Sequence, residues 1–281
     1  MQDTGHVLVS NLGGGNEFLK KIQEQIKTGE RSFREASEDM WGSLTIPIED
    51  GFDTMRNNMS MDPKFKEFHE FCMQNNISFN VISAGLRPIL RKVLDAFLGA
   101  QEVSLYLLCL GVVMMAVTNK IVQSSNINIV ANDADIDGST PWKPIWLHET
   151  ELGHDKALSV NQGRAEAAEA CLEGEIPLII FIGDGVSDLT AAREADILFA
   201  RKGLKLEEYC NHNQIPYIPF ETFADVKKEV QHIMKEDLEK TGGTGIPARF
   251  NPRANMWRRI SSKQAVCFYF LLFTIFCWAR C

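Results

Sequence analysis

Residues 177–195 read P-L-I-I-F-I-G-D-G-V-S-D-L-T-A-A-R-E-A, and this stretch decides the fold. The apolar run 178–182 is typical of a strand that is buried on both faces of a parallel sheet. The glycines around Asp184 end that strand, and Ser187 or Asp188 can cap a following helix that runs to the end of the stretch. We therefore predict a strand, a tight turn and a helix. The turn lies at the carboxyl end of the strand, where open α/β sheets collect their functional groups.

Two carboxylates, Asp184 and Asp188, stand four residues apart in this turn, with a glycine on each side of the first. Oxygen ligands of this kind suit Mg²⁺, a hard cation that binds carboxylates, water and phosphate. The glycines let the backbone approach an ion without a Cβ in the way. The alternative is an ordinary turn with a capping aspartate, so the interpretation depends on partners elsewhere in the chain.

Composition limits the class of protein. A chain of 281 residues can bury one large core or a core with a small cap. The net charge of -8 argues against a nucleic-acid partner. The 7 cysteines are odd in number and lack metal-ligand spacing, which favours reduced thiols, and the N-terminus lacks the pattern of a signal peptide. We therefore predict a cytoplasmic globular protein.

Two apolar stretches, 105–117 and 266–279, differ from the rest of the chain. Both are shorter than the roughly 18 to 20 residues that cross a bilayer, so membrane association is not expected. We interpret 103–123 as an atypical apolar insert and 236–281 as a linker and apolar tail. Splice-site sequences can encode Val103-Ser104, Thr118-Asn119, Gln123 and Val266-Cys267. We therefore favour the interpretation that 103–123 and the segment from Val266 onward are unspliced introns. A membrane-surface protein is the remaining alternative.

Elsewhere, apolar periodicity predicts an α/β order. Helices are expected within 16–58 and after Asp62-Pro63, and a strand at 77–82 ends at Ser83 before a helix that opens near Pro88. Further strands are expected before Gly138, at 142–146, 196–200 and 217–220, and further helices at 161–171 and 224–234.

Two polar residues outside the opening stretch are candidates for a phosphate site. A hydroxyl at the end of a strand beside a helix N-terminus, such as that of Ser83, is suited to hold a phosphate oxygen, although it can equally be a helix cap. Lys156 follows the segment G-H-D and would bring a positive charge. A lone lysine is more often solvated, so only the combination gives it meaning.

An acidic segment contains Asp133, Asp135 and Asp137 before Gly138 and resembles the beginning of a calcium loop. The bidentate glutamate required at the twelfth position is here Pro144, and no helices flank the loop, so we do not favour that interpretation.

The order S-A-G at 83–85, Lys156 and G-D-G-x-x-D at 183–188 resembles the haloacid dehalogenase (HAD) superfamily of Mg²⁺-dependent phosphohydrolases. V-I-S-A-G-L-R-P-I-L, G-H-D-K and F-I-G-D-G-V-S-D-L-T are most similar to the branch with phosphoserine phosphatase and the 2-hydroxy-3-keto-5-methylthiopentenyl-1-phosphate phosphatases. The resemblance covers about 10–235 without the insert. It implies a doubly wound parallel α/β sheet with a small helical cap, and hydrolysis of a small-molecule phosphomonoester with Mg²⁺ as cofactor.

The resemblance also implies roles for individual residues. Ser83 would donate a hydrogen bond to the phosphoryl group, with Gly85 and Lys156 in the substrate site, and Lys156 would neutralise charge. Asp184 would ligate Mg²⁺ and Asp188 would hold a metal-bound water. These roles agree with phosphoryl transfer, in which positioning and cancellation of oxygen charge supply most of the catalysis.

One part of the family pattern is absent. The family attacks phosphate with an aspartate of a D-x-D-x-[TV] motif at the end of its first strand, which should precede about residue 10. Only Asp3 stands there, so we expect a chain truncated at its N-terminus, without the first strand and nucleophile. The segment Asp135-Ile136-Asp137 is a weak replacement, because it follows Ser83 in the chain and precedes Pro141. The alternative function is a catalytically inactive remnant that binds phosphate, metal or a partner protein.

The predicted organisation has three parts. They are the truncated N-terminus with the helical cap at 1–61, the α/β core at 62–235, and the linker with its tail at 236–281.

Overall fold

The computed structural model describes residues 4–98, 127–170, 175–241, 265–273 and 277–279. Its helices are α1 (Thr4–Leu12), α2 (Gly15–Thr28), α3 (Phe33–Gly42), α4 (Ile48–Asn58), α5 (Phe65–Gln74), α6 (Arg87–Leu98), α7 (Lys156–Ala170), α8 (Leu189–Ala192), α9 (Lys205–His212) and α10 (Phe223–Thr241), with a short 3₁₀ turn η1 (Val186–Asp188). Its strands are β1 (Met59–Met61), β2 (Ser78–Leu86), β3 (Asn128–Asp135), β4 (Lys143–Ile145), β5 (Glu175–Gly183), β6 (Ile197–Arg201), β7 (Ile218–Phe220), β8 (Ala265–Phe273) and β9 (Cys277–Ala279). Asp3 and the apolar insert lie outside the described residues.

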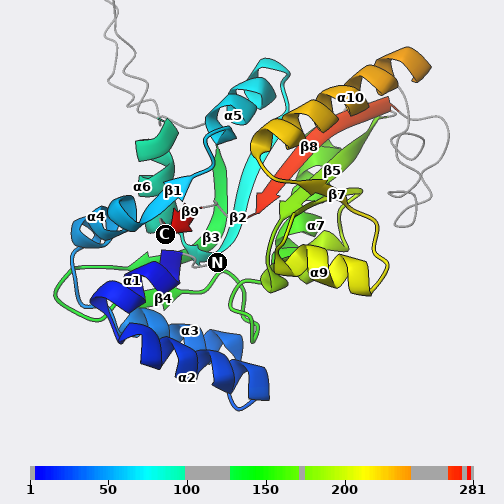
Figure 1. Cartoon of the computed structure of the whole chain (residues 1–281). Coiled ribbons are helices and arrows are strands. Elements are labelled where there is room, and N and C mark those ends of the chain that lie inside the picture. Colours follow the sequence, from blue (N-terminus) through cyan, green and yellow to red (C-terminus); the bar gives the residue numbers. More distant parts are fainter. Residues whose placement is uncertain (1–3, 99–126, 171–174, 242–264, 274–276, 280–281) are drawn as a thin grey trace, which may run out of the picture.

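A seven-stranded sheet with the order β4-β3-β2-β8-β5-β6-β7 forms the centre of the structure (Figure 1). All neighbouring strands pair in parallel except β4, which is antiparallel to β3. The two short strands β1 and β9 pair separately. Parallel pairing brings the carboxyl ends of β2 and β5 to the same edge of the sheet, so Ser83 and Asp184 lie along one edge.

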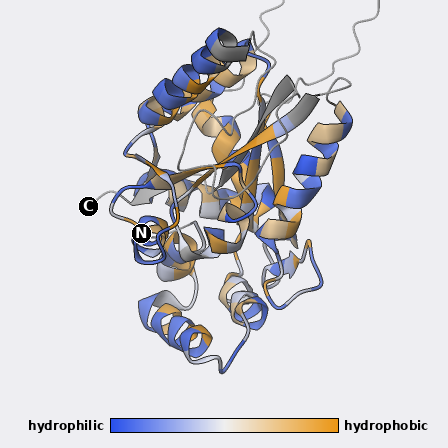
Figure 2. Ribbon diagram, turned by 90° about the vertical axis from the view of Figure 1, so that its right-hand side faces the viewer, coloured by the Kyte–Doolittle hydropathy of each residue, from blue (hydrophilic) through white to orange (hydrophobic). Residues whose placement is uncertain are grey.

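Strand β5 shows why the sheet is covered on both faces. Ile180 and Ile182 belong to the hydrophobic core on the side of α5, α6 and α10, whereas Ile179 and Phe181 belong to the core on the side of α7, α8 and α9. The apolar run therefore meets the requirement of an internal parallel strand, and Figure 2 shows hydrophobic strands between helices with hydrophilic outer faces. The predicted doubly wound α/β fold is confirmed.

The strand between β2 and β5 is β8, which comes from the C-terminal part of the chain. We expected this segment to be a tail outside the core. Instead β8 pairs in parallel with both neighbours, with Phe273 opposite Ile82 and Leu272 opposite Ile182. An uninterrupted apolar sequence is what a position buried on two faces requires, and 265–273 has one.

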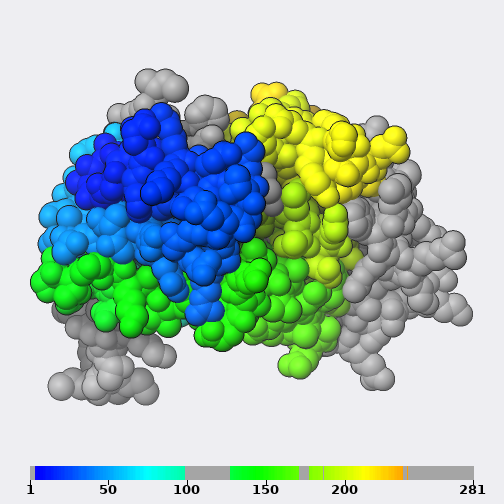
Figure 3. Space-filling model, turned by 90° about the horizontal axis from the view of Figure 1, so that it is seen from below, coloured from blue at the N-terminus to red at the C-terminus, as the bar shows by residue number. Residues whose placement is uncertain are grey.

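Four helices, α1 to α4, form a layer that we call the helical cap, and in Figure 1 they lie below and to the left of the sheet. Trp41 on α3 stacks on Trp142 with ring centroids 6.3 Å apart, and both rings are buried. Viewed from below in Figure 3, the blue cap lies against the green segment that leads into α7. The cap therefore shares one continuous core with the sheet.

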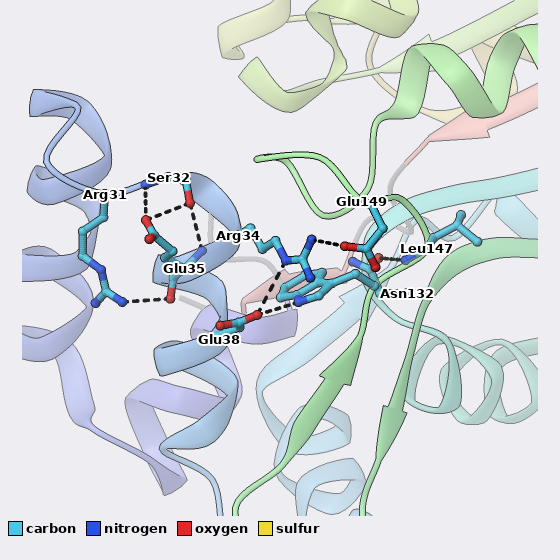
Figure 4. A network of polar contacts seen from close by, with 9 residues as sticks. Arg31, Ser32, Arg34, Glu35, Glu38, Asn132, Leu147 and Glu149 are labelled. Carbon is cyan, nitrogen blue, oxygen red and sulfur yellow. Dashed lines mark hydrogen bonds and ion pairs between the residues drawn. The ribbon is translucent and has the colours of Figure 1, made fainter.

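Polar contacts hold α3 against the loop after β4 (Figure 4). Ser32 and Glu35 form a reciprocal capping box that fixes the start of α3. The Arg34 guanidinium donates to Glu149 at 2.8 Å, and the indole N–H of Trp146 donates to Glu38 at 2.8 Å. These contacts orient the face of α3 that points toward the carboxyl edge of the sheet.

Several helix boundaries differ from the sequence-based expectation. Helix α7 begins at Lys156 rather than near residue 161, because the Asp155 carboxylate accepts from the Ala157 N–H at 2.9 Å and caps the helix. Helix α8 ends at Ala192, before the end of the predicted helix. At its N-terminus Asp188 occupies the cap position but does not cap the helix with its side chain, because its carboxylate accepts from other groups. Helix α1 lies before the first helix expected from the sequence. Within the described part of the chain, no helix combines the length and apolarity of a bilayer span.

Candidate active site

A cavity of about 90 Å³ lies between the helical cap and the carboxyl edge of the sheet. The cap contributes an apolar wall and two hydroxyl residues, Thr4 on α1 and Ser37 on α3, and the core contributes the other polar groups. The lining residues are Thr4, Gly5, Phe33, Ser37, Met40, Trp41, Ser83, Ala84, Gly85, Leu90, Lys156 and Ser187. All three residues predicted for the substrate site, Ser83, Gly85 and Lys156, thus line the same cavity.

Ser83 lies on β2 where the strand meets the cavity, and its side chain is largely buried. Its Oγ accepts from the Gly85 N–H at 3.1 Å, which leaves the hydroxyl hydrogen free to be donated. A Cβ on Gly85 would stand 3.3 Å from that oxygen, so glycine keeps the approach open. The hydroxyl therefore has the geometry of a donor toward an anionic ligand in the cavity.

Lys156, the first residue of α7, brings the positive charge. Its ammonium donates to Asp188 Oδ1 at 2.8 Å and to Ser187 Oγ at 3.1 Å. The lysine and aspartate side chains are 4% and 0% exposed, so neither charge is solvated. The ion pair holds a cation at the cavity wall, where it can attract phosphate oxygens.

Asp188 fixes the turn after β5. Its Oδ2 accepts from the backbone N–H groups of Asp184 and Gly185, each at 2.9 Å, while Oδ1 faces Lys156. Both oxygens are thus engaged by the protein itself. These contacts explain the spacing of the G-D-G-x-x-D motif. The second aspartate of the motif accepts from the backbone N–H groups of the first aspartate and of the glycine that follows it.

Asp184 differs from Asp188 in its surroundings. Its side chain is buried, and Oδ2 has no hydrogen-bond partner in the described structure. Burial, together with the negative charge of Asp188, raises the pKa of Asp184 to about 7, although Lys156 and Arg201 act in the opposite direction. A buried carboxylate oxygen without a partner is costly, and a cation would compensate it.

This environment fits Mg²⁺. The free oxygen of Asp184 is a hard ligand, and Mg²⁺ commonly takes only one or two carboxylates and completes its shell with water and phosphate. Among the described residues no group of three or more His, Cys, Asp or Glu side chains could enclose a metal. Asp184 and Asp188 do not themselves line the cavity. Asp188 contacts the lining residue Lys156, and the backbone N–H of Asp184 donates to Asp188.

The acidic segment at the end of β3 is not part of this site. Asp137 Oδ1 accepts from the N–H groups of Ser139 and Thr140 and from the Thr140 hydroxyl, which lowers the pKa of Asp137 to about 2. Strands β2 and β8 separate β3 from β5. The carboxylate of Asp137 therefore stabilises a local turn. The described residues contain no acidic cluster that could enclose a metal, and none of 133–137 lines the cavity, so neither the calcium loop nor a replacement nucleophile is supported.

Several groups at the site are not among the residues predicted from the sequence. Ser187 binds Lys156, and the hydroxyls of Thr4 and Ser37 line the cavity. Ser187 had a signal, because it lies inside the G-D-G-V-S-D motif, but we interpreted it as a helix cap. Thr4 and Ser37 had none, because only the packing of the cap on the sheet brings them there.

A doubly wound sheet with a hydroxyl, a lysine and a buried carboxylate at its carboxyl edge is an arrangement that can bind phosphate. Comparison with known proteins gives the family. The model of the haloacid dehalogenase-like hydrolases matches residues 12–193, and the chain belongs to that family.

The chain is similar in sequence to three characterised proteins. The chain is 31% identical to Pdp3-interacting factor 1 of Schizosaccharomyces pombe, over 83% of this chain and 90% of that protein. It is 29% identical to a polyol phosphate phosphatase of Saccharomyces cerevisiae, over 83% and 89%. It is 27% identical to a 2-hydroxy-3-keto-5-methylthiopentenyl-1-phosphate phosphatase of Bacillus cytotoxicus, over 78% and 86%. The predicted resemblance to this branch of phosphatases is confirmed.

Proposed function

We propose that this chain binds a small-molecule phosphomonoester together with Mg²⁺ and acts as a HAD-type phosphomonoester hydrolase. The observation that carries the proposal is the convergence of the Ser83 hydroxyl, the Lys156 ammonium and the unpartnered Asp184 carboxylate at one edge of the sheet. Two relatives support the proposal, because one is named a polyol phosphate phosphatase and the other a 2-hydroxy-3-keto-5-methylthiopentenyl-1-phosphate phosphatase. We keep the cytoplasm as the predicted location.

The proposed roles follow from the contacts. The Ser83 hydroxyl donates to one phosphate oxygen, and the backbone at Gly85 leaves room for the phosphate. Lys156 cancels negative charge on a second oxygen and is itself oriented by Asp188. Asp184 is the proposed Mg²⁺ ligand, and the bound cation would add positive charge against the phosphate. Asp188, proposed to hold a metal-bound water, already uses both oxygens to fix Lys156 and the turn.

The cavity also limits the leaving group. Phe33, Met40 and Trp41 give an apolar wall, and Ser37 adds a hydroxyl. Among the described lining residues Lys156 is the single charged side chain, and in the proposed arrangement it faces the phosphate rather than the leaving group. An amino-acid leaving group would bury charges without partners, which is unfavourable. We therefore propose a small, uncharged, hydroxylated leaving group.

A second candidate is phosphate binding without turnover. In the family that the chain resembles, hydrolysis uses a carboxylate nucleophile at the end of a strand beside these groups. The strand between β2 and β5 is β8, and 265–273 contains no Asp or Glu. This observation favours a protein that binds a phosphorylated ligand as a sensor or partner.

An assay with p-nitrophenyl phosphate separates the two candidates. We expect turnover that requires Mg²⁺ and falls by about 100-fold or more in Asp184→Asn, while Asp53→Asn, an exposed control on α4, keeps full activity. Undetectable turnover in a protein that still binds inorganic phosphate would support the second candidate. Absence of both turnover and binding would overturn the proposed function.

A further inference from the structure

His154 lies buried between the end of β2 and the start of α7, with 3% of the residue exposed. Its Nδ1 is 2.6 Å from the carbonyl oxygen of Ser83, and its Nε2 is 2.7 Å from Ser159 Oγ. The ring thus joins the residue that offers the hydroxyl to the helix that offers Lys156. No role was assigned to it from the sequence, where it appeared only within G-H-D-K.

The hydrogen-bond partners define the tautomer. A carbonyl oxygen can only accept, so Nδ1 carries the hydrogen and donates to Ser83, and the lone pair of Nε2 accepts from the Ser159 hydroxyl. Burial lowers the pKa of His154 to about 4, so the ring is neutral near pH 7 and this arrangement persists.

Ser83 is held from two sides. His154 fixes its carbonyl, and the Gly85 N–H fixes its Oγ. A hydroxyl can direct its hydrogen at a phosphate oxygen only while the backbone of the residue stays in place, because displacements of about 1 Å weaken such contacts strongly. Lys156 follows His154 by two residues in the chain. The position of Lys156 is therefore coupled, through His154, to the position of Ser83.

We propose that His154 is a positioning residue, which fixes Ser83 relative to Lys156 for phosphate binding. This inference rests on the proposed function, because it concerns the same cavity. It differs from a simple packing role, since a histidine that only fills the core would affect stability but not the contribution of the Ser83 hydroxyl.

Calorimetric titration of inorganic phosphate, with MgCl₂ present, tests the proposal. We expect Ser83→Ala to weaken binding about tenfold, the value of one hydrogen bond to a charged group. His154→Phe should weaken binding by a similar factor. In the Ser83→Ala background, His154→Phe should change the affinity less than about twofold, because the contact that it supports is already gone. His154→Asn, whose amide nitrogen can replace Nδ1 as donor, should restore most of the affinity.

His69→Phe is the matched control. His69 is also buried, but it lies on α5 against Phe79, away from the cavity, and should leave phosphate affinity unchanged. If His154→Phe does not fold, as judged by circular dichroism, His154→Gln takes its place, because it keeps a polar group but moves the donor. The inference would be overturned, without affecting the proposed function, if His154→Phe weakened phosphate binding equally in wild type and in the Ser83→Ala background. It would also be overturned if His154→Phe left phosphate affinity unchanged. A wild-type chain that binds no phosphate would overturn the proposed function and the inference with it.

Discussion

The ammonium of Lys156 lies 2.8 Å from Oδ1 of Asp188, and both side chains are shielded from water. A buried ion pair of this kind adds little net stability compared with an apolar pair, but removing one partner leaves a charge without compensation. The relationship between these two residues therefore has consequences for stability as well as for ligand binding.

Lys156→Met should lower the free energy of unfolding by about 3 to 5 kcal/mol, because Asp188 would keep a buried charge. Urea denaturation measures the change. Lys20→Met is the control, since Lys20 and Glu17 form an ion pair with 70% and 88% of the side chains exposed, and it should have little effect. Adding Asp188→Asn to Lys156→Met should recover part of the loss. Equal small effects at both lysines would contradict the buried pair.

Gly153→Ala should destabilise the fold more than Gly203→Ala. Both glycines have positive φ, 66° and 73°, so each substitution strains the backbone by about 1 kcal/mol. A Cβ on Gly153 would also meet the Trp146 ring at 2.3 Å, whereas a Cβ on Gly203 meets nothing within 4 Å. Thermal unfolding should show an additional loss of about 1 to 3 kcal/mol at Gly153. Equal losses would mean that Trp146 moves aside freely.

The pH dependence of stability should report on His154. Its pKa is lowered from 6.5 to about 4, so the native ring binds fewer protons than the unfolded one between these values. Its contribution is fully present above about pH 6.5 and is lost as the pH falls to about 4, by up to about 3 kcal/mol. The raised pKa of Asp184 acts in the opposite direction, since its contribution is lost as the pH rises toward about 7.

A variant that lacks the titrating ring separates the two effects. The difference in unfolding free energy between wild type and His154→Asn should shrink as the pH falls from 7 to about 4, because only wild type loses the contribution of His154. The effect of Asp184 cancels in this difference, since Asp184 titrates in both proteins. A difference that stays constant over this range would show that His154 does not titrate with a lowered pKa.

Much of the fold could be predicted because its signals are local. The apolar run that forms β5, and the run ending at Ser83, indicate internal strands. The motifs at the ends of these strands contain the candidates Ser83 and Asp184, and the G-H-D-K segment contains Lys156. Helix α7 began earlier than expected only because the capping role of Asp155 was overlooked.

The rest depends on contacts between distant parts of the chain. Nothing local in 265–273 indicates that it pairs between β2 and β5, since its apolar sequence is equally compatible with a tail. Likewise the ion pair of Asp188 with Lys156 and the place of Ser37 at the cavity depend on packing between distant residues. The motifs thus proposed candidate site residues, whereas the contacts that each of them makes required the three-dimensional arrangement.

The central claim is that Ser83, Lys156 and Asp184, which converge at one edge of the sheet, bind phosphate and Mg²⁺ next to each other. The most direct measurement is the affinity for inorganic phosphate, determined by calorimetry with and without MgCl₂, in wild type and in Asp184→Asn. Since the two ligands would occupy adjacent positions, we predict that Mg²⁺ strengthens phosphate binding about tenfold or more in wild type, and that Asp184→Asn abolishes this coupling but keeps weak binding. Phosphate affinity that is the same with and without Mg²⁺ in the wild-type chain would contradict the account.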